Sequence, residues 1–228
     1  CAGREAQATV TSKDRSDQQV ADAVSWLIAN GLLPQEKHAR AVAMAQHSSE
    51  RMDQLLLKLG LVNEQHLAVR DMVRSFAREQ VAPVASQHDE DSTFPWVNVK
   101  AMGELGLLGI PWSEDVGGAG FDTISFMIAI EELAKVCASH SITISAHTTL
   151  GTSPILSFGS KAQIEQYVPL LASGKVLGGF GLTEESAGSD AGGTRTTAEK
   201  KDGYYLLNGS KRFITHAGVG EVFVVTAV

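Results

Sequence analysis

The chain reads Phe180-Gly-Leu-Thr-Glu-Glu-Ser-Ala-Gly-Ser-Asp190 at one point and Asn208-Gly-Ser-Lys-Arg-Phe-Ile-Thr-His216 shortly afterwards. Each run places hydroxyl groups and glycine backbone beside an apolar residue. Thr183 and Thr215 stand at the ends of two predicted strands, and a pair of hydroxyls there can hydrogen-bond the polar edge of one planar ring. A single strand threonine more often serves only the β-structure. The pairing of the two runs therefore carries the prediction that residues 180–216 form one wall of a ring-binding site.

A glycine-rich loop follows the first run. Gly188-Ser-Asp190 and Ala191-Gly-Gly193 allow backbone N–H groups to approach an anion, as in turns that bind phosphate or pyrophosphate. Glycines beside a hairpin also serve the turn alone, so the loop by itself is a weak signal. The chain has no G-x-G-x-x-G motif in a βαβ context and no Walker lysine pattern, which excludes the Rossmann and P-loop interpretations.

Residues after Gly174 follow a strand period, with tight-turn dipeptides at Asp202-Gly203 and Asn208-Gly209. The predicted strands are Val176–Leu182, Thr194–Glu199, Tyr204–Leu207, Lys211–Thr215 and Val222–Val228. Because helices precede them, the predicted fold class is α+β, an all-helical N-terminal domain followed by an antiparallel β domain. The last apolar strand runs to the end of the chain, so we expect the β domain to be incomplete and to continue beyond Val228.

Residues before Gly174 follow a helical period. A long helix from about Asn63 to Gln87 has Val69, Met72, Val73 and Phe76 on one face and a kink at Pro83. A further helix is predicted over Pro95–Leu105 and ends at Gly106, and another begins after the N-cap residue Asp122. A third is predicted from Ser160 to Gly174, where Ser160 and Gln163 form a capping box. Between them, residues 141–157 predict a buried helix with Ile142, Leu150, Ile155 and Leu156 inside.

Composition excludes several classes of protein. The 228 residues carry a formal net charge of −7, which argues against nucleic-acid and membrane-surface binding. Two cysteines, Cys1 and Cys137, are too few for a disulfide framework or a zinc cage and fit a reducing compartment. No apolar run reaches the roughly 18 residues of a membrane span. Residues 1–17 are polar and expected to be disordered. A first residue of Cys rather than Met is compatible with a fragment.

Residues 18–65 form a predicted helical module that contains a weak repeat. Gly31-Leu-Leu-Pro-Gln-Glu recurs as Gly60-Leu-Val-Asn-Glu-Gln, and in both copies a glycine closes one helix before a short turn opens the next. The simpler interpretation is two ordinary helix–turn–helix joints. The alternative is a docking module, since the stretch faintly resembles the helical N-terminal module of type II secretion and pilus ATPases. The role of the module stays open.

The order of the two runs, residues 181–191 and then 207–215, resembles the acyl-CoA dehydrogenase family. The resemblance covers about residues 66–228 and includes Gly117-Gly-Ala-Gly120, Ile130-Glu-Glu-Leu-Ala134 and Ser145-Ala-His-Thr-Thr-Leu-Gly151. It implies a helical domain over residues 66–174 and part of a barrel-like middle β domain over residues 175–228. A C-terminal four-helix domain would follow, with FAD between it and the β domain.

The resemblance also implies roles for individual residues. The isoalloxazine of FAD would be contacted by Phe180, Leu182 and Thr183 and covered by Phe213, Ile214 and Thr215, while Gly188 and Ser189 would lie by the flavin and the CoA, with Ser189 as substrate ligand. Two departures from the family pattern, Glu185 in place of Pro and His216 in place of Asn, put loop rigidity and contacts to the flavin edge in doubt.

The implied reaction is α,β-dehydrogenation of an acyl-CoA thioester, and residues 141–157 look most like those of short-chain members. A carboxylate of the C-terminal domain would be the base, so we assign no catalytic residue to this chain and expect it to be inactive alone. Glu184 and Asp190 belong to the flavin-side loop, and Glu131 and Glu132 fit a solvated helix face. His147 has no partner that the sequence identifies.

The resemblance further implies electron-transfer flavoprotein as electron acceptor, a homotetramer at full length, and a location in the bacterial cytoplasm or the mitochondrial matrix. Two competing functions remain open. One is an acyl-CoA oxidase or nitroalkane-oxidase-like enzyme on the same fold. The other is a non-catalytic relative or adaptor in which residues 1–65 recruit a partner.

Overall fold

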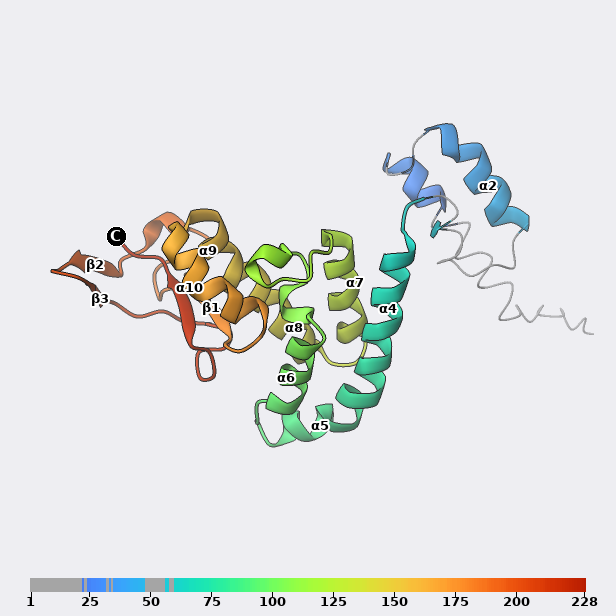
Figure 1. Cartoon of the computed structure of the whole chain (residues 1–228). Coiled ribbons are helices and arrows are strands. Elements are labelled where there is room, and N and C mark those ends of the chain that lie inside the picture. The colour runs from blue at the N-terminus through green and yellow to red at the C-terminus, as the bar shows by residue number, and fades with distance from the viewer. Residues whose placement is uncertain (1–21, 23, 32, 34, 48–55, 58–59) are drawn as a thin grey trace, which may run out of the picture. The chain divides into compact units, whose positions relative to one another are not determined.

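The computed structural model describes residues 22, 24–31, 33, 35–47, 56–57 and 60–228. The chain divides into two compact units, Cys1–Leu67 and Ala68–Val228 (Figure 1). The division falls close to the predicted boundary at residues 65 and 66. The other predicted boundary, at residues 174 and 175, lies inside the second unit, where helices give way to strands. The predicted polar end, residues 1–17, lies outside the described residues.

The first unit contains the 3-10 turn η1 (Gln35–Lys37) and helix α2 (His38–His47). Val24, Leu33 and Ala41 form its buried core. Gly31 and Gly60 have φ angles of +67° and +66°, the left-handed conformation that glycine adopts at a helix C-terminus. The two glycines predicted to close helices therefore have the conformation that this role requires.

A long bent helical segment crosses the boundary into the second unit and is made of α4 (Glu64–Phe76), the π-helical turn η2 (Ala77–Val81) and α5 (Ala82–Glu90). The N–H of Ala82 donates to the carbonyl of Ala77, five residues back. Pro83 has no N–H to donate, so the regular α-helical pattern cannot pass through it. Figure 1 shows the bend between α4 and α5, which confirms the predicted kink.

The remaining helical elements follow in chain order, and α6, α7 and α10 among them have the predicted end signals. They are α6 (Trp96–Glu104), η3 (Leu107–Gly109), η4 (Glu114–Val116), α7 (Thr123–Ala134), α8 (Ala138–Ala146), the π-helix η5 (His147–Thr152), α9 (Ser153–Phe158) and α10 (Lys161–Ala172). Asp122 caps α7 by accepting a 2.8 Å hydrogen bond from the Ser125 N–H. Ser160 and Gln163 form the predicted capping box of α10. Gly106, at φ +73°, ends α6.

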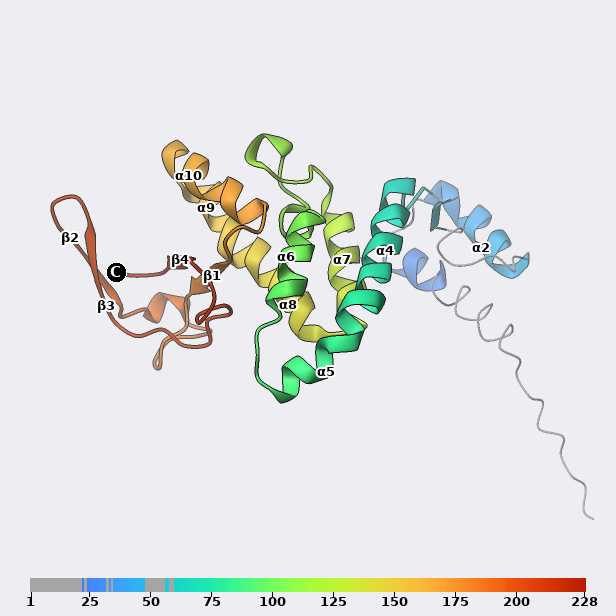
Figure 2. The ribbon, with the colours of Figure 1, turned by 60° about the horizontal axis from the view of Figure 1, so that its bottom comes forward.

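Helices α4, α6, α7 and α8 lie side by side and enclose the main core (Figures 1 and 2). From α4, the predicted face contributes Val69, Val73 and Phe76, all buried. From α7, the buried contributors are Phe126, Ala129 and Leu133. Burial of apolar side chains at this spacing is what the helical period predicts.

Residues 141–157 are helical, and of the four side chains predicted to lie inside, Ile155 and Leu156 are half-buried whereas the other two are exposed. Ile142 is 54% exposed and Leu150 is 45% exposed, so the prediction that they lie inside is wrong. The inner face is instead largely polar, because its hydroxyls find backbone acceptors. Thr148 donates to the carbonyl of Leu108 at 3.2 Å, and Thr152 donates to the carbonyl of His147 at 3.0 Å.

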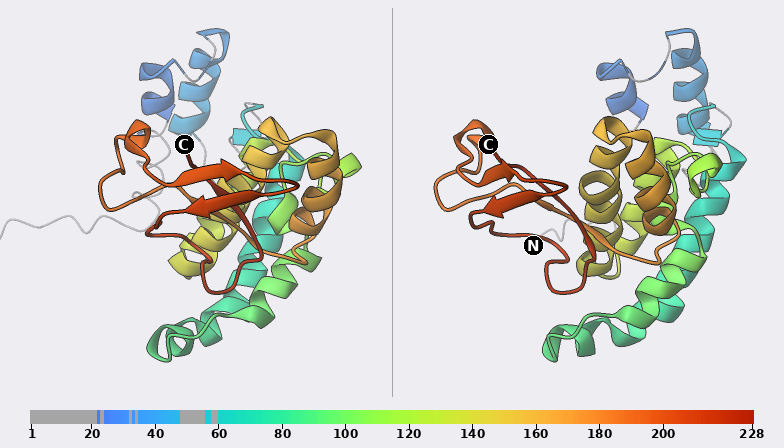
Figure 3. Two further views of the ribbon diagram at one scale, coloured as in Figure 1. Left: turned by 90° about the vertical axis from the view of Figure 1, so that its left-hand side faces the viewer. Right: turned by 60° about the vertical axis from the view of Figure 1, so that its left-hand side comes forward.

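Four short strands form two separate pairs. β2 (Thr197–Lys200) and β3 (Tyr205–Asn208) are antiparallel, as expected, with Thr197 opposite Asn208. β1 (Gly178–Gly181) and β4 (Val222–Val225) are parallel, with Phe180 opposite Val224. The parallel pairing was not anticipated, although the intervening stretch is long enough for a crossover connection. The β2–β3 hairpin extends away from the helices (Figures 2 and 3).

The predicted strand Lys211–Thr215 is wrong. Phe213 and His216 have φ angles of 57° and 70°, which break an extended backbone at both places. The segment instead passes alongside the end of β1 as an irregular chain. In the described part of the protein, no helix combines the length and apolar character that crossing a membrane requires.

Candidate functional site

The structure brings the two ends of the 180–216 stretch together. The N–H of Arg212 donates to the carbonyl of Thr183 at 2.7 Å, and Lys211 Nζ donates to the carbonyl of Leu182 at 3.0 Å. Segments 180–183 and 211–215 are therefore neighbours, as the ring-binding interpretation requires, although only the first belongs to a strand.

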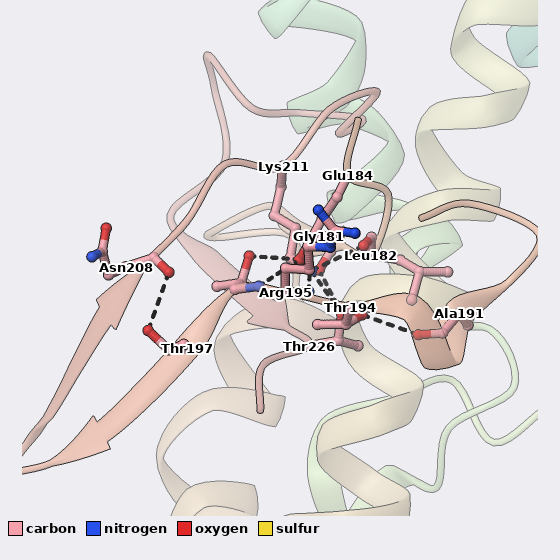
Figure 4. Close-up of polar contacts among 11 residues, drawn as sticks. Gly181, Leu182, Glu184, Ala191, Thr194, Arg195, Thr197, Asn208, Lys211 and Thr226 are labelled. Atoms are coloured by element: carbon pink, nitrogen blue, oxygen red, sulfur yellow. Dashed lines mark hydrogen bonds and ion pairs between the residues drawn. The ribbon is translucent and has the colours of Figure 1, made fainter. Parts of the chain in front are cut away.

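A buried ion pair lies beneath this junction (Figure 4). Lys211 Nζ is 2.7 Å from Glu184 Oε1, and both side chains are only 7% exposed. The ammonium also donates to Thr226 Oγ1 at 3.0 Å, so its three protons have three acceptors. Full pairing offsets the cost of removing both charges from water.

Glu184 uses its remaining acceptor capacity on the loop that returns to β2. The N–H of Arg195 donates to Oε2 at 2.7 Å, while the N–H and hydroxyl of Thr196 donate to Oε1 at 2.9 and 2.6 Å. The Lys211 hydrogen bond, followed by those from Thr196, lowers the pKa of Glu184 to about 2. Glu184 is thus a permanently ionised structural anchor. The sequence placed it in the loop but did not reveal this role.

The candidate site residues divide into two groups by exposure. Phe180, Leu182, Thr183, Ile214 and Thr215 are half-buried, whereas Gly188, Ser189 and Phe213 are exposed. Phe213 is the extreme case, since its side chain is 90% exposed and its backbone is left-handed. Such a conformation costs a non-glycine residue about 1 kcal/mol or more. The local structure therefore holds an aromatic ring out of the protein.

Two hydroxyls at the junction stand out by their hydrogen bonding. Within the described residues, no hydrogen bond involves the hydroxyl of Thr183 or of Thr215, although both residues are half-buried. Every other threonine hydroxyl of the strand region has a protein partner, namely those of Thr194, Thr196, Thr197 and Thr226. Neither hydroxyl is among the buried polar atoms that lack a partner in the described structure, so both are open to an external partner.

The glycine-rich loop forms a short 3-10 turn, η6 (Ala191–Gly193), in which the Gly193 N–H donates to the Asp190 carbonyl at 3.1 Å. Gly188 precedes this turn in an open position. A Cβ atom on Gly188 would meet only the methyl group of Thr183, at 3.9 Å. The loop leaves space beside Thr183 rather than filling it.

His147, for which the sequence identifies no partner, has two in the structure. It is fully buried, and its Nδ1 accepts the Gly178 N–H at 3.0 Å while Nε2 lies 2.9 Å from the Leu171 carbonyl. Desolvation lowers the pKa of His147 to about 4. The ring is therefore neutral at physiological pH and joins the end of α10 to the start of β1.

Glu132 is buried, which is also a correction. Its carboxylate accepts two 2.8 Å hydrogen bonds from the Arg74 guanidinium and one of 2.7 Å from Lys135. The Arg74 hydrogen bonds, which outweigh the effect of burial, lower the pKa of Glu132 to about 2. Glu131 is 66% exposed, as expected of a solvated face. Glu132 thus joins α4 to α7 and is not poised to accept a proton.

Comparisons with known proteins agree with this arrangement. Residues 63–175 match the family model described as acyl-CoA dehydrogenase, N-terminal domain, and residues 179–228 match the model of the middle domain. The two matched regions meet where the helices end and β1 begins. The chain belongs to the acyl-CoA dehydrogenase family.

Among curated relatives, an acyl-CoA dehydrogenase of Bacillus subtilis is 47% identical over 167 residues, covering 73% of this chain and 44% of the relative. A short-chain specific acyl-CoA dehydrogenase of Clostridium acetobutylicum is 46% identical over 172 residues, covering 75% of this chain and 45% of the relative. The chain thus spans less than half the length of these relatives.

Two solved structures share the fold. One, of the electron transferring flavoprotein of Acidaminococcus fermentans, matches with a TM-score of 0.71 and 40% identity over 73% of this chain and 44% of that one. The other, an acyl-CoA dehydrogenase of Bacillus anthracis complexed with FAD, matches with a TM-score of 0.67 and 36% identity over 73% of this chain and 29% of that one.

Proposed function

We propose that this chain is part of an FAD-dependent enzyme that removes hydrogen from the α and β carbons of an acyl-CoA thioester. Family membership supports the reaction class. The observation that carries the assignment to this surface is the pair of unbonded hydroxyls, Thr183 and Thr215, at the junction of the two segments. Because the chain spans under half of its relatives, the proposal concerns the whole protein.

The residues present fit FAD. Thr183 and Thr215 offer two hydroxyls to the polar edge of the isoalloxazine, and Phe213 offers an aromatic wall that is already held away from the protein. Half-buried Phe180, Leu182 and Ile214 would complete the contact with the ring. FAD, when bound, would supply the ring that accepts hydride from the substrate.

The chain's own residues would bind and orient. Lys211 and Glu184 hold the two segments in register beneath the site, so the threonines keep their spacing. Gly188 and Ser189, on the exposed loop, would lie toward the flavin and the CoA, with Ser189 as substrate ligand. We assign no general base to these residues, since Glu184 and Glu132 are both committed to ion pairs.

The substrate we propose is a short-chain acyl-CoA, because a relative at 46% identity is a short-chain specific dehydrogenase. Electron-transfer flavoprotein is the proposed acceptor of electrons, as membership of the acyl-CoA dehydrogenase family implies. We propose further that the full-length protein is a homotetramer in a reducing compartment, the bacterial cytoplasm or the mitochondrial matrix.

Titration of the purified full-length protein with FAD tests the assignment. Flavin fluorescence should be quenched as the ring stacks on Phe213, and butyryl-CoA should then perturb the absorbance of the bound flavin. The double variant Thr183→Ala/Thr215→Ala is the matched comparison and should bind FAD more weakly. A full-length protein that takes up no FAD, or a full-length double variant with unchanged affinity, would overturn the assignment.

A further inference from the structure

Gly178, the first residue of β1, is held by two buried imidazoles from opposite sides. Its N–H donates to His147 Nδ1 at 3.0 Å, and its carbonyl accepts from His216 Nδ1 at 2.9 Å. His147 belongs to η5 in the helical part of the unit, whereas His216 follows the 211–215 segment. One peptide residue thus connects three separate parts of the chain.

The donors and acceptors determine the state of each ring. Because the Gly178 N–H is a donor, His147 Nδ1 must be unprotonated, and its proton sits on Nε2, which donates to the Leu171 carbonyl. His216 needs the opposite arrangement, with the proton on Nδ1. Its Nε2 is buried and has no hydrogen-bond partner in the described structure. The two rings therefore have complementary, non-interchangeable tautomers.

The position of Gly178 in the chain determines which segments these two hydrogen bonds hold. Gly178 lies two residues before Phe180, so it sets where the 180–183 segment begins. His216 directly follows Thr215, so it sets where the 211–215 segment ends. The edge of the Phe94 ring packs against His216, with centroids 6.2 Å apart, which limits movement of the imidazole.

We propose that His147 and His216 are positioning residues that set the spacing of Thr183 and Thr215 by holding Gly178 from both sides. The proposal rests on the proposed function only in taking the threonines as ring ligands. The positioning role itself concerns this chain alone, because the contact between segments 180–183 and 211–215 can be measured without any cofactor.

Substitutions can separate positioning from simple filling of the core. His147→Gln keeps one acceptor and one donor, and His216→Asn keeps one donor for the Gly178 carbonyl. His147→Leu and His216→Leu keep bulk and remove the hydrogen bonds. If the imidazoles only fill space, the leucine variants should behave like the wild-type chain. If the imidazoles position Gly178 through hydrogen bonds, the amide variants should behave like the wild-type chain and the leucine variants should not.

Amide hydrogen exchange of the FAD-free chain provides the first measurement. The Arg212 N–H, which donates to the Thr183 carbonyl, reports contact between the segments, and the Val73 N–H in α4 reports opening of the core. We expect each leucine variant to lose about tenfold protection at Arg212, the equivalent of roughly one hydrogen bond. Protection at Val73 should stay the same, and the amide variants should match the wild type at both sites.

Equal loss at Arg212 and Val73, or no loss at Arg212, would overturn the proposal. If His147→Leu does not fold, His216→Leu decides, because His216 belongs to no helix, whereas His147 lies within η5. FAD affinity gives a second, separate result, with a rise of about tenfold in Kd expected for the leucine variants. A full-length wild-type protein that binds no FAD would reject the proposed function, and the exchange measurement would still decide the positioning role.

Discussion

Gly151 of η5 and Gly178 of β1 touch backbone to backbone. A Cβ atom on Gly151 would lie 2.6 Å from the carbonyl carbon of Gly178, and one on Gly178 would lie 3.0 Å from the Cα of Gly151. Gly151 is four residues after His147, so both face Gly178 from one side of the π-helix. The Ser145–Gly151 motif thus contains the two residues, His147 and Gly151, that contact the start of β1.

Replacement of Gly151 by alanine should therefore destabilise the protein. No real Cβ tolerates a contact of 2.6 Å with backbone, so β1 must shift, at a cost of about 1–3 kcal/mol. Helix propensity would favour alanine by up to about 1 kcal/mol, which works against the effect. Urea unfolding measures the net change.

Gly218→Ala is the matched control, because a Cβ there meets no atom within 4 Å. It should change the free energy of unfolding by less than about 0.5 kcal/mol. An equally small effect of Gly151→Ala would show that β1 is free to move away from η5.

The sequence predicted the helices because their signals are local. The capping residue Asp122, the capping box at Ser160, the stop at Gly106 and the kink at Pro83 all depend on neighbours within one turn. Recognition of the family likewise rested on contiguous runs. These features are encoded by residues that lie close together along the chain.

What the sequence could not show depends on contacts between distant residues. The bonds from Lys211 to Glu184 and from Arg74 to Glu132 span 27 and 58 residues, so burial of either carboxylate has no local signal. The left-handed conformations of Phe213 and His216 likewise belong to residues whose intrinsic preference is for other backbone angles. The sequence of residues 211–215 therefore predicts a strand, whereas the conformation of the segment depends on its tertiary contacts.

Stability should fall as the pH drops from about 6.5 to about 4. Burial lowers the pKa of His147 to about 4, so in this range the imidazole is protonated in the unfolded chain and neutral in the folded protein. The contribution is complete above pH 6.5 and amounts to about 3 kcal/mol for a shift of this size. His216, whose pKa burial also lowers, adds in the same direction.

Urea unfolding at a series of pH values from 7.5 to 4.5 tests this dependence. His147→Gln cannot titrate and should reduce the slope of the curve in this window, while His140 and His216, whose pKa values burial also lowers, keep their contributions. Glu132 and Glu184, whose pKa values are lowered to about 2, lose their contributions only below about pH 4.5. A wild-type curve that is flat between pH 6.5 and 4.5 would contradict the neutral, buried state of His147.

The Glu132 carboxylate should contribute more to stability than its neighbour Glu131. Glu132→Gln removes the charged acceptor of two Arg74 hydrogen bonds and should cost roughly 1–3 kcal/mol, a moderate value because Arg74 keeps 30% exposure. Glu131→Gln removes only an exposed ion pair with Lys135 and should cost less than about 0.5 kcal/mol. Both variants alter the same helix by one atom type, so their difference in urea midpoint isolates the buried pair. Equal midpoints would mean that the Arg74 contact contributes nothing.

The hydroxyls of Thr183 and Thr215 should contribute to cofactor affinity rather than to folding. Neither forms a hydrogen bond within the described residues, so Thr183→Ala or Thr215→Ala should leave the urea midpoint nearly unchanged. Each should weaken FAD binding by roughly 1–3 kcal/mol, because the ring would lose a partner in a desolvated contact. Thr123→Ala provides the control, since this exposed residue at the start of α7 lies outside the site and its hydroxyl is also unbonded in the described structure. The opposite pattern, lower stability with unchanged FAD affinity, would assign the two threonines to the fold and remove them from the ring-binding surface.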